Sequence, residues 1–232
     1  MTKSKPSSQD EPHYIGHRQR LRTRLLQGEG ESLHDYELLE SLLFAVIPRR
    51  DVKPLAKQLL KQAGGLWPLL HADVAQLHAW GLMETSIALL RTVGLINLRA
   101  QKNEILDKPL LNNWQRIVDY CRASMAHKKI EEFRLLFLDR KNHLIHEEVQ
   151  QRGTIDHTPA YPREIVRRAL DVGAGALVLC HNHPSGDVAP SKADIEMTRE
   201  IVAACAPLGI VIHDHIIIGA GEVMSFKELA LL

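Results

Sequence analysis

The chain of 232 residues has few cysteines, almost no net charge and no long apolar run. Its cysteines, Cys121, Cys180 and Cys205, are odd in number and widely spread, which argues against a disulfide framework and for a reducing compartment. The formal net charge of +1 excludes a global field favouring nucleic acid or membrane, although charge can be segregated locally. No run approaches the roughly 20 apolar residues that span a bilayer, and MTKSKPSSQDEP lacks the apolar core of a signal peptide. We therefore expect a cytoplasmic protein with no membrane partner.

The composition is that of a soluble globular protein, with 45% hydrophobic and 25% charged residues, and the length is enough for two small domains. Residues 1–12 are polar and aperiodic, which predicts a disordered tail. Apolar residues then recur three or four apart, so residues 13–107 are expected to form a small all-helical domain.

The first expected helix, GHRQRLRTRLLQ, carries four arginines that spread around most of the helix circumference: Arg18, Arg20, Arg22 and Arg24. Such a run is usually a solvated face, and a phosphate-contacting surface is the functional alternative. Further on, GLMETSIALLRTVGLINLRAQ outlines a helix, a break marked by Gly94 and a second helix, as in helix-hairpin-helix modules. Gly81 and Gly94 lack the glycine spacing of a DNA-binding hairpin, and packing explains both segments equally well. We expect a helix-hairpin-helix-like domain, with DNA as a candidate partner.

In the second half of the chain, the pattern of apolar residues predicts strands mixed with helices. LDKPLLNN is an expected connector, followed by a helix over 114–126. EEFRLLFLDRKNHLIHEEVQ predicts two strands around a polar turn at 139–142. PREIVRRALDVG predicts an amphipathic helix, ALVLC a strand, SKADIEMTREIVAACAPLG a helix and IVIHDHIIIG a strand. Residues 110–232 are therefore expected to form an α/β or α+β sheet domain.

The stretch HNHPSGDVAPSKAD carries the chemistry. His181 and His183 stand at i and i+2 at the end of an extended apolar run, so both imidazoles point to one side of a strand. Zinc takes His nitrogen and carboxylate oxygen, and a catalytic site uses three protein ligands with water as the fourth. Asp194 is the natural third ligand, because the intervening loop contains Gly186 and two prolines and can turn back.

Each residue of the stretch also has a structural interpretation. Ser191 and Asp194 form S-x-x-D ahead of a helical pattern, which is typical of a helix N-cap. Cys180 neighbours His181 on the strand and should face the opposite way, as a buried residue and not a ligand. A second H-x-H pair, His213 and His215, lacks a returning carboxylate, so a buried role or one supporting the ligands is favoured over a second metal site.

Taken together, these residues resemble the JAMM motif of MPN-type zinc metallopeptidases: His181, His183, Pro184, Gly186, Ser191 and Asp194. The resemblance extends over residues 110–232 to the RadC branch, through RGTID, PREIVRRAL, LVLCHNHPSGD, PSKADIEMT, LGIVIHDHIIIG and SFKELALL. It implies a JAMM/MPN domain with a cytidine-deaminase-like mixed sheet and flanking helices. Two departures are His213, where relatives have an apolar residue, and Tyr161, where histidine is common.

The resemblance implies that His181, His183 and Asp194 hold Zn²⁺ and that Ser191 supports an oxyanion or the bound water. It also requires a glutamate on a neighbouring strand as general base. Glu147 and Glu148 are the candidates, and the position five residues before the G-T pair selects Glu148. Since neighbours on a strand face opposite ways, the other glutamate is expected to be exposed to solvent.

We therefore expect a zinc-dependent hydrolase of RadC type that cleaves a peptide or isopeptide bond in a protein or peptide substrate. The alternative is a DNA-repair or recombination accessory protein whose zinc domain is inactive or serves as an interaction module. A structural zinc is disfavoured, because such sites close all four positions with protein ligands and only three are found here. MPN domains often pair, so the resemblance also implies a possible homodimer.

Overall fold

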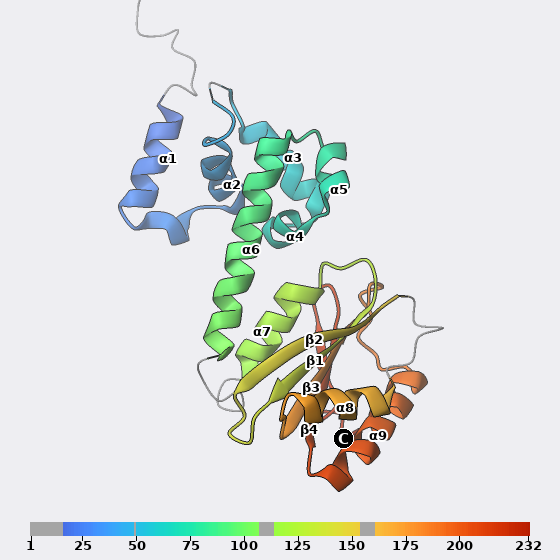
Figure 1. Ribbon diagram of the computed structural model, residues 1–232. Coiled ribbons are helices and arrows are strands. Elements are labelled where there is room, and N and C mark those ends of the chain that lie inside the picture. Colours follow the sequence, from blue (N-terminus) through green and yellow to red (C-terminus); the bar gives the residue numbers. More distant parts are fainter. Residues whose placement is uncertain (1–15, 49, 107–113, 154–160) are drawn as a thin grey trace, which may run out of the picture. The chain divides into compact units, whose positions relative to one another are not determined.

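A computed structural model describes residues 16–48, 50–106, 114–153 and 161–232. The chain forms two compact units, Met1–Leu95 and Ile96–Leu232 (Figure 1). The expected tail over 1–12 and most of the expected connector lie outside the described residues. In the part of the chain that is described, no helix is long and apolar enough to cross a membrane.

The first unit is entirely helical in its described part. It contains α1 (His17–Leu26), η1 (Glu29–Ser32), α2 (Asp35–Leu43), α3 (Lys53–Ala63), α4 (Leu66–His71), α5 (Val74–Ala79) and the first half of α6 (Glu84–Leu106). Local signals fix the boundaries: Gly64 ends α3 in a left-handed conformation, and the Asp73 carboxylate caps α5 by accepting a hydrogen bond from the Gln76 amide. Leucines from several helices form the core: Leu39, Leu43, Leu59, Leu69, Leu77 and Leu90.

The arginines of α1 divide between internal and external roles. Arg18 donates to the carbonyl oxygens of Ile47, at 2.8 Å, and Arg50, at 2.6 Å, beyond the end of α2. Arg24 donates to the Glu37 carboxylate of α2 at 2.9 Å. These two arginines therefore tie α1 to its neighbours, while Arg20 and Arg22 are exposed. The expected spread around the helix is confirmed.

The expected break at Gly94 is wrong, because α6 runs without interruption from Glu84 to Leu106. Gly94 serves close packing: a Cβ atom there would lie 2.7 Å from the carbonyl oxygen of Leu70. The glycine lets the backbone of α6 approach the end of α4. The helix, break, helix pattern that suggested a hairpin is thus a single helix with one tight contact.

The second unit is built on a five-stranded mixed sheet in the order β2-β1-β3-β4-β5 (Figure 1). Its elements after α6 are α7 (Trp114–Met125), β1 (Glu132–Leu138), β2 (Leu144–Arg152), α8 (Pro162–Asp171), β3 (Ala176–Asn182), α9 (Lys192–Cys205), η3 (Ala206–Leu208), β4 (Val211–Ile218) and β5 (Val223–Ser225). β3 pairs antiparallel with β1 and parallel with β4, so α9 makes the crossover that a parallel pair requires. The expected mixed-sheet fold, its hairpin and its helices are confirmed.

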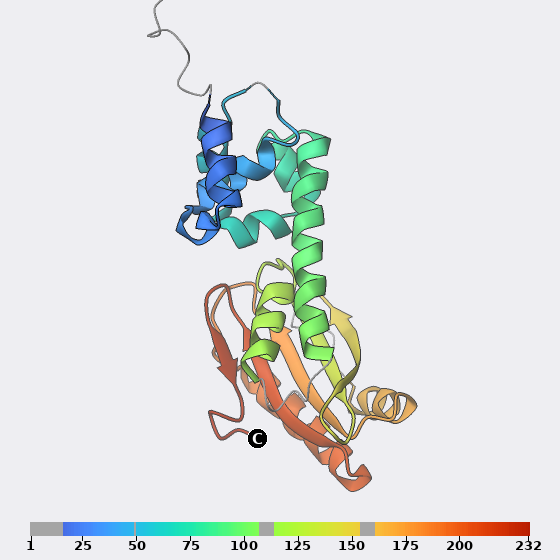
Figure 2. The same ribbon diagram turned by 90° about the vertical axis from the view of Figure 1, so that its left-hand side faces the viewer.

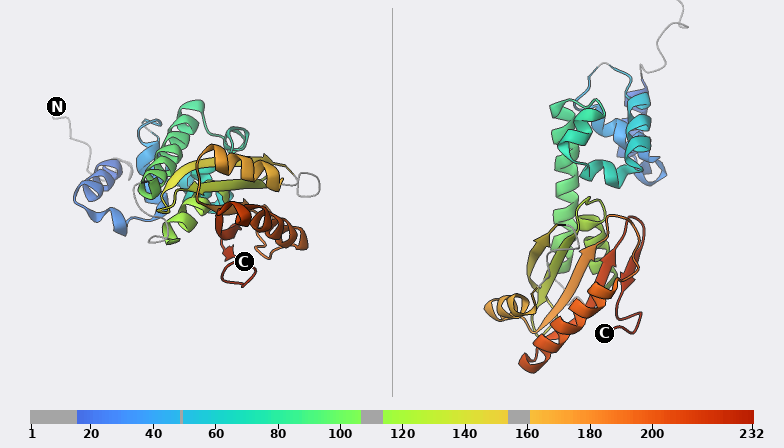
Figure 3. Two further views of the ribbon diagram at one scale, coloured as in Figure 1. Left: turned by 60° about the horizontal axis from the view of Figure 1, so that its bottom comes forward. Right: turned by 90° about the vertical axis from the view of Figure 1, so that its right-hand side faces the viewer.

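Helices cover both faces of this sheet. In Figure 2, α7 lies in front of the strands, and the opposite view in Figure 3 (right) has α9 in front. On the α7 face, even-numbered residues of β1 and β3 pack against Ile117, Cys121 and Met125. On the other face, odd-numbered residues pack against α8 and α9, including Ile165 and Ile201. β3 is buried along its whole length, as its apolar run from Ala176 to Cys180 predicts, and this burial includes the polar His181 and Asn182 at its end.

Replacing Gly94 by alanine is expected to destabilise the helical unit, although alanine favours a helix over glycine by about 1 kcal/mol. The added methyl group would meet the Leu70 carbonyl oxygen, and overpacking of this kind costs about 1–3 kcal/mol. Urea unfolding followed by circular dichroism measures the change. The matched control is Thr92→Ala at an exposed position of the same helix, expected to be neutral or slightly stabilising. A Gly94→Ala protein as stable as wild type would contradict the close-packing role.

Candidate metal centre

Two histidines stand where β3 ends. The His181 side chain is fully buried, and His183 follows immediately after the strand with its backbone amide bonded to the Ile218 carbonyl at the end of β4, at 2.9 Å. Their Nε2 atoms lie 2.9 Å apart. Cys180 faces the α7 side of the sheet, as expected from strand alternation, and is a buried free thiol.

Asp194 reaches the histidines from the first turn of α9. Ser191 caps this helix: its hydroxyl accepts from the Asp194 amide, at 3.1 Å, and donates to Asp194 Oδ2, at 2.6 Å. The Ser191 amide donates to the same oxygen at 2.8 Å. Asp194 Oδ1 lies 3.4 Å from His181 Nε2. The capping-box interpretation is therefore confirmed, and it fixes the orientation of Asp194.

A chain of hydrogen bonds assigns the tautomer of His181. The Thr198 hydroxyl has a single proton, which it donates to the Asp194 carbonyl oxygen at 2.6 Å. His215 Nδ1, 2.7 Å from that hydroxyl, must therefore be the donor, which leaves its Nε2 as an acceptor. His215 Nε2 lies 2.8 Å from His181 Nδ1, so this nitrogen carries the proton of His181. His181 Nε2 is left with a free lone pair, as a metal ligand needs.

A backbone carbonyl assigns the tautomer of His183. His183 Nδ1 lies 2.6 Å from the carbonyl oxygen of Asp187, which can only accept. In its neutral form, His183 therefore also presents a bare Nε2. Burial lowers the pKa of His181, to about 4, which favours the neutral form of that ring. Two lone pairs thus face each other across 2.9 Å, an arrangement that repels on its own and that a cation between them would satisfy.

The spacing of the three ligand atoms fits a small metal ion. Donor atoms about 2.0–2.1 Å from a tetrahedral zinc lie roughly 3.3 Å from one another. The observed separations are 2.9 Å between the histidines, 3.4 Å from His181 to Asp194 and 3.8 Å from His183 to Asp194. Among the residues that the structure describes, these three are the group that could hold a metal. Neutral nitrogen with carboxylate oxygen is a donor set suited to zinc.

The structure does not bring Glu148 to these ligands. β1 lies between β2 and β3, so Glu148 is two strands, roughly 9.5 Å, to the side of the strand that carries His181. Its carboxylate accepts from Arg168 of α8, at 2.8 Å from Nε and 2.6 Å from Nη2, and lies 3.5 Å from His146. The Arg168 hydrogen bond holds the pKa of Glu148 below its usual range.

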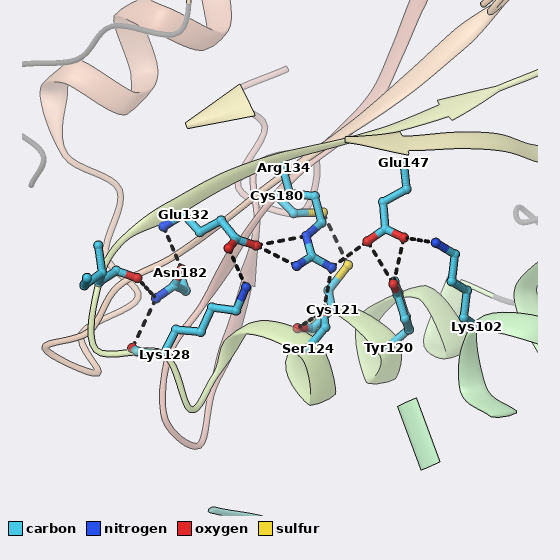
Figure 4. A network of polar contacts seen from close by, with 11 residues as sticks. Lys102, Tyr120, Cys121, Ser124, Lys128, Glu132, Arg134, Glu147, Cys180 and Asn182 are labelled. Carbon is cyan, nitrogen blue, oxygen red and sulfur yellow. Dashed lines mark hydrogen bonds and ion pairs between the residues drawn. The ribbon is translucent and has the colours of Figure 1, made fainter. Parts of the chain in front are cut away.

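Glu147 was expected to be exposed to solvent, and this expectation is wrong. It lies on the face of the sheet that α7 covers, opposite α8 and α9, and its side chain is 9% exposed (Figure 4). Arg134 Nη1, Lys102 Nζ and the Tyr120 hydroxyl all contact its carboxylate, at 2.5–2.8 Å. Burial alone would raise the pKa of Glu147, but these partners, Arg134 foremost, hold it below the usual value.

A different glutamate lies beside the ligands. Glu131 immediately precedes β1, the strand next to β3, and Phe133 two residues later pairs with His181. Its Oε2 is buried and has no hydrogen-bond partner in the described part of the chain. Burial, with the negative charge of nearby Asp194, raises the pKa of Glu131 to about 7. Sequence reasoning passed over it, although its position at the start of an apolar strand was a visible signal.

A β-bulge in β4 turns the two histidines of the second H-x-H pair, His213 and His215, to different surroundings. The register between β3 and β4 shifts between Leu177 and Val178, which places one extra residue, His213, in β4. His213 Nε2 therefore contacts Asn142 Oδ1, at 2.6 Å, while His215 points to His181. The expected buried, ligand-supporting role holds for His215, and the two histidines do not converge on one ion.

The mixed sheet and the His-His-Asp cluster define a JAB-type domain with a candidate metal site. Comparison with known families matches residues 111–231 to the RadC-like JAB domain. A relative named UPF0758 protein, from Rhodobacter capsulatus, is 50% identical over 213 residues, which cover 91% of this chain and 100% of the relative. The chain belongs to the RadC family, as its motifs predicted.

Replacing His215 by leucine is expected to lower the affinity for Zn²⁺ about 10- to 100-fold, because His181 Nδ1 loses the acceptor that fixes its tautomer. Competition with a chromophoric chelator measures the affinity. Thr198→Val, which removes the next link of the chain, should act in the same direction. The matched control is His213→Leu, which should leave the affinity unchanged. Equal losses in the His213 and His215 variants would contradict the assignment.

Proposed function

We propose that this chain is a zinc-dependent hydrolase of peptide or isopeptide bonds in which Glu131 is the general base. The observation that carries the proposal is the convergence of two imidazole nitrogens and a carboxylate oxygen on the sheet face that also bears Glu131, whose buried Oε2 has no hydrogen-bond partner among the described residues. This combination supplies ligands and a proton acceptor at one place.

His181, His183 and Asp194 would hold the ion and leave its fourth position open, as in catalytic zinc sites. When bound, zinc lowers the pKa of a water molecule to about 7 and polarises a substrate carbonyl. The protein's own contribution is to aim both histidines at one point and, through burial, to favour the neutral form of His181. The hydrogen bonds from Thr198 through His215 perform this task for His181.

Glu131 suits the role of proton carrier. Its free Oε2 can accept a proton from the attacking water and then donate it to the leaving amine. Glu131 precedes Phe133 by two residues, and Phe133 pairs with His181, so strand alternation puts Glu131 on the face of the candidate ligands, where its Oε2 is buried. Glu148 is less suited, because Arg168 already engages its carboxylate and a lowered pKa makes a weaker base.

Ser191 contributes through Asp194. Its only proton is donated to Asp194 Oδ2, so in this arrangement the hydroxyl orients a ligand. The support of an oxyanion implied by the resemblance remains a prediction that needs a different hydroxyl rotamer. The expectation of a DNA-repair accessory role also stays open, and the experiment below separates it from catalysis.

Glu131→Gln is expected to lower kcat about 10²- to 10⁴-fold, the range that general base catalysis supplies, while zinc content stays at that of the wild type. Glu148→Gln is expected to lower kcat by less than about tenfold, since its carboxylate bonds to Arg168. The assay is hydrolysis of a mixed peptide and isopeptide library, with metal content measured by elemental analysis.

The two glutamine variants form a matched pair, and His183→Ala is the control for metal loss. Loss of cleavage in the Glu148 variant with retention in the Glu131 variant would restore Glu148 as the base. Zinc binding by wild type without any cleavage would favour the DNA-associated accessory role. Absence of zinc would refute the metal centre.

A further inference from the structure

Asn182 stands between the two histidine ligands but faces away from them. Strand alternation turns His181 toward Asp194 and turns Asn182 to the α7 side of the sheet. The residue is 1% exposed. A buried amide at this point needs partners for two donors and an acceptor.

The partners of Asn182 all belong to the backbone that leads into β1 (Figure 4). Asn182 Oδ1 accepts from the Glu132 amide at 2.9 Å. Asn182 Nδ2 donates to the carbonyl oxygens of Ile130, at 3.2 Å, and Lys128, at 3.4 Å. A single side chain therefore binds both backbone neighbours of Glu131.

The side-chain amide of Asn182 continues the hydrogen bonding between β1 and β3 beyond the last backbone pair. The β1–β3 pairing ends at Phe133 and His181. One step further along, the side chain of Asn182 supplies the acceptor for the Glu132 amide that a strand would otherwise provide. The segment before β1 is thus held to the metal-binding end of β3 by a side chain that mimics a peptide group.

Further contacts hold the Glu132 side chain and the Glu131 carbonyl group. Glu132 is held by Lys128 and by Arg134, whose Nη2 lies 2.6 Å from its Oε1 (Figure 4). The Glu131 carbonyl oxygen accepts from the Gly153 amide at 3.1 Å. The backbone is therefore bonded at Glu131 and at both of its neighbours, while Glu131 Oε2 has no hydrogen-bond partner within the part of the chain that the structure describes.

We infer that Asn182 is a positioning residue that holds Glu131 at the metal centre by clamping the backbone at Lys128, Ile130 and Glu132. The inference rests on the proposed function, in which Glu131 is the base. A base displaced by about 1 Å can cost on the order of 100-fold in rate, so the clamp would contribute to turnover and not to metal binding.

The first arm of the test is a double-mutant cycle on the full chain with zinc. Asn182→Ala is expected to lower kcat about 10- to 100-fold, with KM and Zn²⁺ affinity changed by less than about threefold. In a Glu131→Gln background the same change should lower kcat by less than about threefold, because the residue acts through Glu131. An equal loss in both backgrounds would overturn the inference.

The second arm does not depend on activity. Amide hydrogen exchange of Glu132, whose partner is Asn182, should accelerate at least about tenfold in Asn182→Ala. The matched control is Ser124→Ala, which removes a buried hydrogen bond donated by Arg134 and leaves the contacts of Asn182 intact. Exchange of the Glu132 amide should remain slow in this variant. Unchanged exchange in Asn182→Ala would refute the clamp.

The two arms separate the inference from the proposed function. If wild type cleaves nothing, the proposed function fails, and the exchange experiment still decides whether Asn182 holds the segment of Glu131. If Asn182→Ala does not fold, Asn182→Asp replaces it: the carboxylate still accepts from the Glu132 amide but cannot donate to the two carbonyls. Its kcat should fall as in the alanine variant, and wild-type kcat in Asn182→Asp would overturn the inference.

Discussion

The alternation of side chains at the end of β3 is the constraint on which the rest of the site depends. His181 points to the face where Asp194 arrives from α9, and Cys180 and Asn182 point to the face covered by α7. Because β3 is an interior strand with helices on both faces, neither set of side chains reaches solvent. One short segment can therefore supply metal ligands on one side and a backbone clamp on the other.

On the α7 face of the sheet, behind the candidate metal site, buried charges pair with one another. Arg134, with a side chain 8% exposed, lies between Glu132 and Glu147, and each carboxylate has a lysine partner as well. Burial alone would lower the pKa of Arg134, but the two carboxylates raise it above its usual value. Removing a partner from such a buried set costs far more than a surface ion pair contributes, so the network makes a stiff support for the start of β1.

The ligands could be predicted from the sequence because they lie in one stretch whose local rules are strong. Strand alternation places His181, and the capping box places Asp194 through Ser191. The proposed base could not be chosen in this way, because the choice between Glu131 and Glu148 depends on which strand lies next to β3. The fold of α6 was missed for a similar reason: the value of Gly94 depends on the approach of Leu70, a contact that no local pattern records.

The charge of the candidate ligand set supports the proposed role of a glutamate beside the site and not within it. Burial lowers the pKa of both His181 and His215 and so favours their neutral forms, which leaves Asp194 as the only candidate ligand with a negative charge, at the N-terminus of α9. A divalent cation held by one carboxylate retains an excess of positive charge, which favours negative charge developing on a carbonyl oxygen. A second carboxylate ligand would cancel this excess. In the proposed function, Glu131 is held by its backbone neighbours outside the ligand set and moves protons without reducing this positive charge.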